Sequence, residues 1–112
     1  MKTLIQGGTI ISASDQCVAD VLIENEKIIQ IGINLNSQNV DQVVDATGKL
    51  LLPGGIDVHT HFDLPMLDTV SSDDHYSGHK AAAFGGTTTV IDFVPQNGSD
   101  LHKDIDLWFG KA

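Results

Sequence analysis

The sequence predicts an α/β chain in two parts, a β-rich layer at residues 1–52 and a βαβα unit at residues 53–112. Short alternating segments separated by turn residues fill the first part. The Pro53-Gly54-Gly55 turn then marks a change of pattern. Beyond it, β-branched segments alternate with helical ones, which is typical of a parallel sheet with crossover helices.

The β-rich part is expected to contain short strands joined by tight turns. The expected strands are Thr3–Gln6, Thr9–Ser12, Asp20–Glu24, Lys27–Ile31, Val43–Asp45 and Lys49–Leu52. Gly7-Gly8 suits a tight turn or a bulge, and Asn25-Glu26 suits a two-residue hairpin. Residues 46–48 form another turn, and the polar stretch 33–41 reads as a surface loop. We expect a small antiparallel layer that needs a partner sheet to cover both of its faces.

The second part is expected to continue as strand, helix, strand and helix. Its elements are a strand at Ile56–His61, a loop at Phe62–Val70, a helix from about Ser72 to Phe84, a strand at Thr87–Val94 and a helix beginning after Ser99. Ser72 is the expected N-cap of the first helix, and Gly85-Gly86 is its expected stop. Because two parallel strands cannot bury both faces of a sheet, we expect these residues to be the N-terminal part of a larger protein.

Two histidines stand one residue apart in the expected strand Ile56–His61. Side chains at positions i and i+2 of a strand share a face, with Cα atoms roughly 7 Å apart. His59 and His61 are therefore predicted to point the same way and to converge on one metal ion. Asp57 falls on the same face, one step deeper.

The composition argues against several classes of partner. The formal net charge is −9 and all six basic residues are lysines, which disfavours binding to nucleic acids or anionic membranes. Cys17 is the single cysteine, so no intramolecular disulfide can form and a reducing compartment is favoured. No apolar run suits a secretory signal or a membrane span. We therefore expect a cytoplasmic protein.

The string GGIDVHTHFDLP, followed by SSDDHYSGHKAAAFGGTTTVIDF, resembles the amidohydrolase superfamily and, within it, the D-hydantoinase/dihydropyrimidinase family. The resemblance covers nearly the whole chain. It implies a (β/α)₈ barrel accompanied by a β-sandwich. Residues 1–52 would then contribute strands to the sandwich, and residues 53–112 would begin an incomplete barrel whose first strand is Ile56–His61.

The same resemblance implies a metal-dependent enzyme that hydrolyses the ring amide of hydantoins or dihydropyrimidines through a metal-activated hydroxide. Family members use two metal ions, usually zinc. Carried over onto this sequence, His59 and His61 would bind one of these ions, and Asp57 would support them from the layer below. Neutral imidazoles suit Zn²⁺, which lowers the pKa of a bound water towards about 7.

The loop after the histidines matches the region that shapes the family's substrate pocket, so Phe62, Leu64 and Met66 are candidate apolar pocket walls. No catalytic residue is assigned. The family's other ligands, a carboxylated lysine, two histidines and an aspartate, come from later barrel strands. The isolated chain is therefore expected to bind zinc weakly or not at all, to be inactive, and to associate into a homo-oligomer through its unpaired sheet edges.

Other activities remain as alternatives. Dihydroorotases resemble this pattern but carry an arginine just after the second histidine, where this chain has Phe62. Nothing in this stretch excludes an allantoinase. The alternative from another class is a stand-alone, non-catalytic assembly or binding protein that uses its β-layer and exposed strand edge.

Two further features are interpreted as structural. His75 and His79 are at i and i+4 and share a helix face, which is expected to be solvated because its neighbours are polar. Asp92 lies near the end of the second expected strand. It either serves a functional site there or accepts a hydrogen bond from the backbone.

Overall fold

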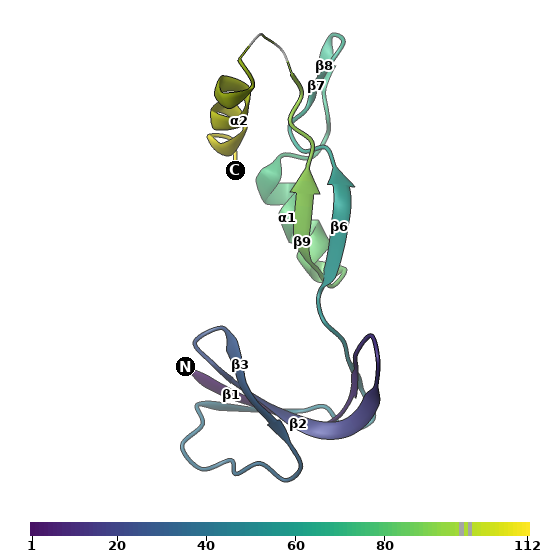
Figure 1. The fold of residues 1–112 in the computed structure, drawn as a ribbon, viewed down its shortest axis with the longest axis vertical. Helices are drawn as coiled ribbons and strands as arrows, with labels where there is room; N and C mark the ends of the chain where they lie inside the picture. Colours follow the sequence, from purple (N-terminus) through teal and green to yellow (C-terminus); the bar gives the residue numbers. More distant parts are fainter. Residues whose placement is uncertain (97, 99) are drawn as a thin grey trace. The chain divides into compact units, whose positions relative to one another are not determined.

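The structure, a computed structural model, describes residues 1–96, 98 and 100–112. The chain divides into two compact units, Met1–Pro53 and Gly54–Ala112. Figure 1 shows that strands make up the first unit, whereas the second combines strands with both helices. No helix within the described residues has the length and apolar character needed to cross a membrane.

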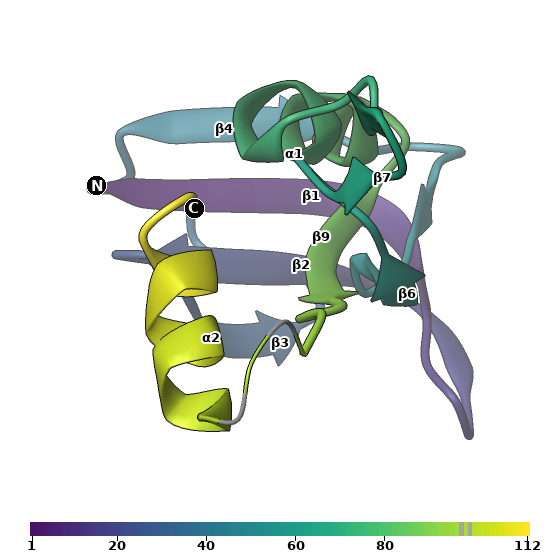
Figure 2. The same ribbon diagram turned by 90° about the horizontal axis from the view of Figure 1, so that it is seen from above.

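The first unit is one five-stranded mixed sheet. Its strands are β1 (Lys2–Ile11), β2 (Gln16–Glu24), β3 (Lys27–Gly32), β4 (Gln42–Asp45) and β5 (Leu50–Leu51). Figure 2 shows the order β3-β2-β1-β4, and β5 also pairs with β1.

The expectation of an antiparallel layer is only partly right. Strands β1, β2 and β3 pair in antiparallel fashion, but β4 and β5 run parallel to β1. The β2–β3 hairpin and the loop after it return the chain so that β4 enters in the direction of β1. Alternation along a strand indicates which face is buried and says nothing about strand direction.

The structure decides between a turn and a bulge at Gly7-Gly8 and confirms the hairpin at Asn25-Glu26. Gly7 and Gly8 lie inside the continuous strand β1, where the register shifts between Ile5 and Gly8, so this site is a bulge. Gly7 has a φ of 70°, the left-handed region that glycine adopts without strain. Asn25 and Glu26 have φ values of 47° and 68°, which confirms the two-residue hairpin between β2 and β3.

The core of the first unit is small. Its buried apolar side chains are Leu4, Ala19, Val21 and Ala46. Asp20 is buried beside them and is satisfied by backbone donors: the Gly7 N–H at 2.8 Å and the Leu35 N–H at 2.9 Å. This carboxylate therefore ties the bulge of β1 to the loop that follows β3.

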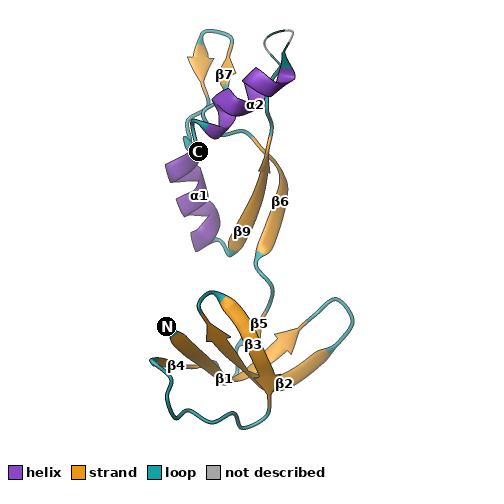
Figure 3. Cartoon of the chain, turned by 60° about the vertical axis from the view of Figure 1, so that its left-hand side comes forward, coloured by secondary structure: helices purple, strands orange, loops and turns teal. Residues whose placement is uncertain are grey.

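The second unit has the expected βαβα order. Its elements are β6 (Gly55–Thr60), β7 (Pro65–Met66), β8 (Thr69–Val70), α1 (His75–Phe84), β9 (Thr87–Asp92) and α2 (Leu101–Phe109). Strands β6 and β9 pair in parallel on either side of α1 in the sequence, as predicted. The expected loop between β6 and α1 contains a short antiparallel hairpin, β7–β8, visible as paired arrows in Figure 3.

Helix α1 begins later than expected, at His75, because Asp74 and not Ser72 is its N-cap. The Asp74 carboxylate accepts a hydrogen bond from the Ser77 N–H at 2.7 Å, and the Ser77 hydroxyl accepts one from the Asp74 N–H at 3.1 Å. This reciprocal pair is a capping box. The bond from the Ser77 backbone N–H holds the pKa of Asp74 below its usual range.

Both helices end at a glycine. Gly85 is the C-cap of α1, as predicted from the sequence, and Gly110 is the C-cap of α2. Helix α2 is capped at its start by Asp100, and the expected boundary residue Ser99 lies outside the described residues. Trp108 is the buried residue of α2.

Candidate metal centre

The two histidines stand at the carboxyl end of β6 with their ring nitrogens converging. The Nε2 atoms of His59 and His61 are 3.0 Å apart, and their ring centroids are 4.9 Å apart. Two nitrogens bound at about 2.0–2.1 Å to one tetrahedral Zn²⁺ lie about 3.3–3.4 Å apart. The two imidazoles therefore need to separate only slightly to bind the same ion.

A phenylalanine from the neighbouring strand packs against both imidazoles. Phe93 follows β9, and its ring is stacked on His59, with centroids 5.8 Å apart and an interplanar angle of 18°. It also contacts His61 at a centroid distance of 5.4 Å. This contact was not predicted from the sequence, although alternation along β9 places Phe93 and Asp92 on opposite faces.

Asp57 supports the backbone that carries the first histidine. Its carboxylate accepts a hydrogen bond from the His59 N–H at 3.1 Å. The bond therefore goes to the main chain of His59 and not to its imidazole. It restrains the strand immediately before the candidate ligands.

Asp92 accepts hydrogen bonds through both of its carboxylate oxygens. Its Oδ1 accepts from the Thr60 hydroxyl at 2.8 Å and from the Phe62 N–H at 3.2 Å, and its Oδ2 accepts from the Trp108 indole at 2.7 Å. Burial raises the pKa of Asp92, but the hydrogen bonds outweigh it and hold that pKa below its usual range. The backbone bond was one of the two interpretations of Asp92, and the two side-chain donors were not foreseen.

The solvated helix face predicted for His75 is wrong. His75 is only 7% exposed, because the ring of Phe62 packs against it at a centroid distance of 5.6 Å and against His79 at 5.1 Å. Gly78 makes this packing possible, since a Cβ there would lie 2.2 Å from the Phe62 ring. The sequence pattern could not reveal this, because the covering ring comes from the loop after β6.

The ring of His75 has few polar neighbours. Within the described part of the chain, neither of its nitrogens has a hydrogen-bond partner, and Nε2 lies 4.0 Å from Asp92 Oδ2. The ring borders a cavity of about 350 Å³ formed by residues of α1, β9 and the α2 region. His59 and His61 do not line this cavity.

The three candidate pocket walls lie in different surroundings. Phe62 packs on α1 as described, Leu64 is half-buried and donates its N–H to the Ser71 hydroxyl at 2.9 Å, and Met66 is 54% exposed on β7. The structure therefore separates Phe62 from the exposed tip of the hairpin.

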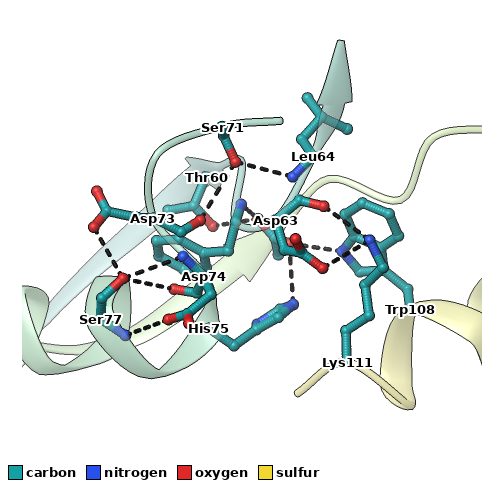
Figure 4. Close-up of polar contacts among 12 residues, drawn as sticks. Thr60, Asp63, Leu64, Ser71, Asp73, Asp74, His75, Ser77, Trp108 and Lys111 are labelled. Carbon is teal, nitrogen blue, oxygen red and sulfur yellow. Dashed lines mark hydrogen bonds and ion pairs between the residues drawn. The ribbon is translucent and has the colours of Figure 1, made fainter. Parts of the chain in front are cut away.

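A lysine near the C-terminal end of α2 anchors the loop that follows the histidines. The Lys111 ammonium donates to the Asp63 carbonyl at 2.8 Å and pairs with the Asp63 carboxylate at 2.9 Å (Figure 4). It also lies 4.4 Å from the centre of the Trp108 ring. Trp108 and Lys111 thus connect the end of α2 to Asp92 at the end of β9 and to Asp63 in the loop after β6.

The donor set is compatible with a metal ion but incomplete. Among residues 1–96, 98 and 100–112, no group of three or more His, Cys, Asp or Glu side chains is placed to hold an ion. Two neutral imidazoles are suitable ligands for zinc, which is typically four-coordinate. His59 and His61 can therefore supply two of the ligands that such an ion requires.

The chain is similar to known proteins over nearly its whole length. The chain is 52% identical over 113 residues to a D-hydantoinase of Geobacillus stearothermophilus, covering 100% of this chain and 24% of the relative. It is 50% identical over 106 residues to a dihydropyrimidinase of Dictyostelium discoideum, covering 94% of this chain and 21% of the relative. No protein-family model matches the chain.

The fold agrees with the same relatives. The crystal structure of the dihydropyrimidinase from Brevibacillus agri matches 100% of this chain with a TM-score of 0.94 and 51% sequence identity, and the match covers 24% of that structure. The chain thus spans about a quarter of the length of its relatives. In sequence and in fold it is similar to the N-terminal quarter of proteins of the D-hydantoinase/dihydropyrimidinase family.

Proposed function

We propose that these residues form part of a metal-dependent cyclic amidohydrolase that opens the ring amide of hydantoins or dihydropyrimidines. The observation that carries the proposal is the convergence of His59 Nε2 and His61 Nε2, 3.0 Å apart at the end of β6. The names of the relatives, D-hydantoinase and dihydropyrimidinase, support the class of substrate.

In this proposal the two histidines bind one zinc ion through Nε2, with their protons on Nδ1. Asp57 restrains the His59 backbone, and Phe93 fixes the planes of both rings. When bound, zinc supplies a water of lowered pKa, near 7, and polarises a carbonyl oxygen. The remaining ligands must be water, substrate or side chains outside the described residues.

The β7–β8 hairpin is the proposed substrate-recognition element. Leu64 and Met66 would contact the apolar substituent of the ring, since Met66 is exposed and Leu64 is only half-buried. Phe62 would act from beneath, because its ring packs between the loop and helix α1. Lys111 would hold the base of this loop through Asp63.

We also propose an architecture, an oligomeric state and a location for the whole protein. Residues 1–52 would contribute to a β-sandwich and residues 53–112 would begin a (β/α)₈ barrel, which the TM-score of 0.94 to a dihydropyrimidinase supports. Barrel active sites lie at the carboxyl ends of the strands, where His61 follows β6. Exposed apolar side chains on β3 and β6 favour a homo-oligomer, and the single cysteine favours a cytoplasmic location.

An activity assay tests the proposal. The protein should be produced from its complete reading frame and assayed on hydantoin, dihydrouracil and allantoin, before and after chelation and with zinc restored. We expect ring opening of hydantoin or dihydrouracil that is lost on chelation and recovered with zinc. Preferential hydrolysis of allantoin would indicate the allantoinase alternative.

A pair of variants locates the activity at the candidate centre. His61→Ala should abolish hydrolysis, whereas His102→Ala, on the exposed side of α2, should leave it unchanged. A metal-loaded protein that opens none of the three rings would instead favour a non-catalytic assembly protein. The 112-residue chain alone should be inactive, because two protein ligands hold zinc weakly.

A further inference from the structure

We propose that Asp92 is a positioning residue for the candidate metal centre. By holding Thr60 and Phe62 from the neighbouring strand, its carboxylate sets the spacing between the imidazoles of His59 and His61. The inference rests on the proposed function, since it assigns a task to Asp92 within that same centre.

The pairing of β6 with β9 is irregular in the segment that carries His59. Asp57 pairs with Val90 and Thr60 pairs with Asp92, so three steps along β6 correspond to two steps along β9. An extra residue in one strand is a bulge, which bends the strand and redirects its side chains. The extra residue falls in the segment that carries His59, so its direction is not set by a regular ladder.

Hydrogen bonds to the Asp92 side chain hold the strand just after this bulge. The Phe93 N–H donates to the Thr60 carbonyl at 3.1 Å, which is the backbone bond beyond the irregularity. Asp92 adds the Thr60 hydroxyl at 2.8 Å and the Phe62 N–H at 3.2 Å. The residues on both sides of His61 are thus bound to one carboxylate oxygen.

The Asp92 carboxylate is itself held in place by α2. Its other oxygen accepts from the Trp108 indole at 2.7 Å, and its side chain is only 11% exposed. Hydrogen bonds to an ionised carboxylate are stronger than those between neutral groups. Asp92 therefore fixes Thr60 and Phe62, the two neighbours of His61, relative to β9, while the Phe93 ring packs against both imidazoles.

The choice of variants separates positioning from folding. Asp92→Ala leaves the buried Trp108 N–H without its acceptor and can prevent folding. Thr60→Val removes only the hydroxyl and keeps the shape of a side chain that is 9% exposed. Thr60→Ser restores the hydroxyl, and Thr89→Val at an exposed position of β9 is the matched control.

Two measurements on the protein from its complete reading frame test the inference. One is the zinc dissociation constant, from competition with a chromophoric chelator well below the melting temperature. The other is the nuclear Overhauser effect between the Hε1 protons of His59 and His61 in metal-free protein with ¹³C-labelled histidine. The second readout reports ring proximity without zinc, and neither moves if Asp92 only contributes to global stability.

We expect Thr60→Val to weaken zinc binding by about tenfold or more, in the range for residues that support metal ligands, and to lose the histidine–histidine effect. Thr60→Ser and Thr89→Val should behave as the unaltered protein. Unchanged affinity and an unchanged Overhauser effect in Thr60→Val would overturn the inference. If the unaltered protein binds no zinc, the proposed function fails, and the Overhauser effect alone decides the role of Asp92.

Discussion

At the scale of single residues, the Nε2 atoms of His59 and His61 lie only 3.0 Å apart. Their lone pairs would repel each other unless a proton or a metal ion lay between them. In the absence of an ion, one Nε2 of the His59–His61 pair must carry a proton and donate it to the other. To bind one zinc ion, as proposed, the two nitrogens would need to separate only slightly, with little movement of either ring.

The sequence predicted the shared face of this pair and the support from Asp57, but not the contacts with Asp92 and Phe93. A spacing of two along a strand predicts a shared face for His59 and His61, which needs no tertiary information. Asp92 and Phe93 come from another strand, so their contacts depend on the β6–β9 register and on the bulge within it. Neither the register nor the bulge leaves a periodic signal in the sequence.

The carboxylate of Asp92 gives a prediction about acid. Because its folded pKa is below the ordinary value of 3.8, the ionised form contributes stability that is fully present above that value and is lost as the pH falls through the lowered folded pKa. Trp108 fluorescence, which reports the bonded indole, should stay constant from pH 7 to about 4 and change only below 3.8.

Two other charged or titratable groups face the Asp92–Trp108 pair. His75 Nε2 lies 4.0 Å from the Asp92 carboxylate, and the Lys111 ammonium lies over the Trp108 ring. Thr60→Val removes one stabilising bond, so it should move the fluorescence transition up towards 3.8. A transition centred above pH 4 in the unaltered protein would mean that the carboxylate is not stabilised by these bonds.

At the scale of elements, the aromatic ring of Phe62 joins helix α1 to the loop after β6. The ring of Phe62 lies over Gly78, between the side chains of His75 and His79. A glycine inside a helix lowers its intrinsic stability by about 1 kcal/mol relative to alanine. At Gly78 the close approach of the ring explains why glycine is used.

Gly78→Ala is therefore expected to reverse the usual effect of such a substitution. The new Cβ would lie 2.2 Å from the Phe62 ring, so overpacking of about 1–3 kcal/mol should exceed the gain in helix propensity. The free energy of unfolding from urea titration should fall. In a Phe62→Leu background, where the ring is gone, Gly78→Ala should instead raise the free energy of unfolding. If Gly78→Ala alone were more stable than the unaltered protein, the Phe62 ring would not occupy this position.

Local chemistry predicted the ends of elements better than their pairing. The Asn25-Glu26 hairpin and the glycine stop of α1 follow from residues that lie at the turns themselves. The start of α1 was misplaced because Ser72 and Asp74 are both good N-caps, and only the bond to Ser77 distinguishes them. The parallel direction of β4 depends on the path of the whole first unit.

At the scale of the whole molecule, each of the two units leaves much apolar surface uncovered. In the first unit, Ile28 and Ile31 of β3 are 63% and 54% exposed. In the second, Ile56 and Val58 of β6 are 64% and 69% exposed. The change of pattern at Pro53 was visible in the sequence, since strands alone precede it and alternating elements follow it.

We predict that the 112-residue chain, produced alone, self-associates through these surfaces and its unpaired strand edges. Light scattering should give a mass well above that of the monomer. Val58→Lys should reduce the association, because it places a charge on an exposed apolar strand, whereas Thr69→Lys on β8 should not. A monodisperse monomer for the unaltered chain would contradict this prediction.

The most direct test of the account is whether His59 and His61 hold the same zinc ion. The measurement is a competitive zinc titration of the protein from its complete reading frame, with His59→Ala, His61→Ala and the exposed control His102→Ala. Each of the first two variants should weaken the tight site by more than the roughly 10–100-fold that loss of a supporting residue causes, and His102→Ala should match the unaltered protein. Tight zinc binding that survives the loss of both His59 and His61 would contradict the account.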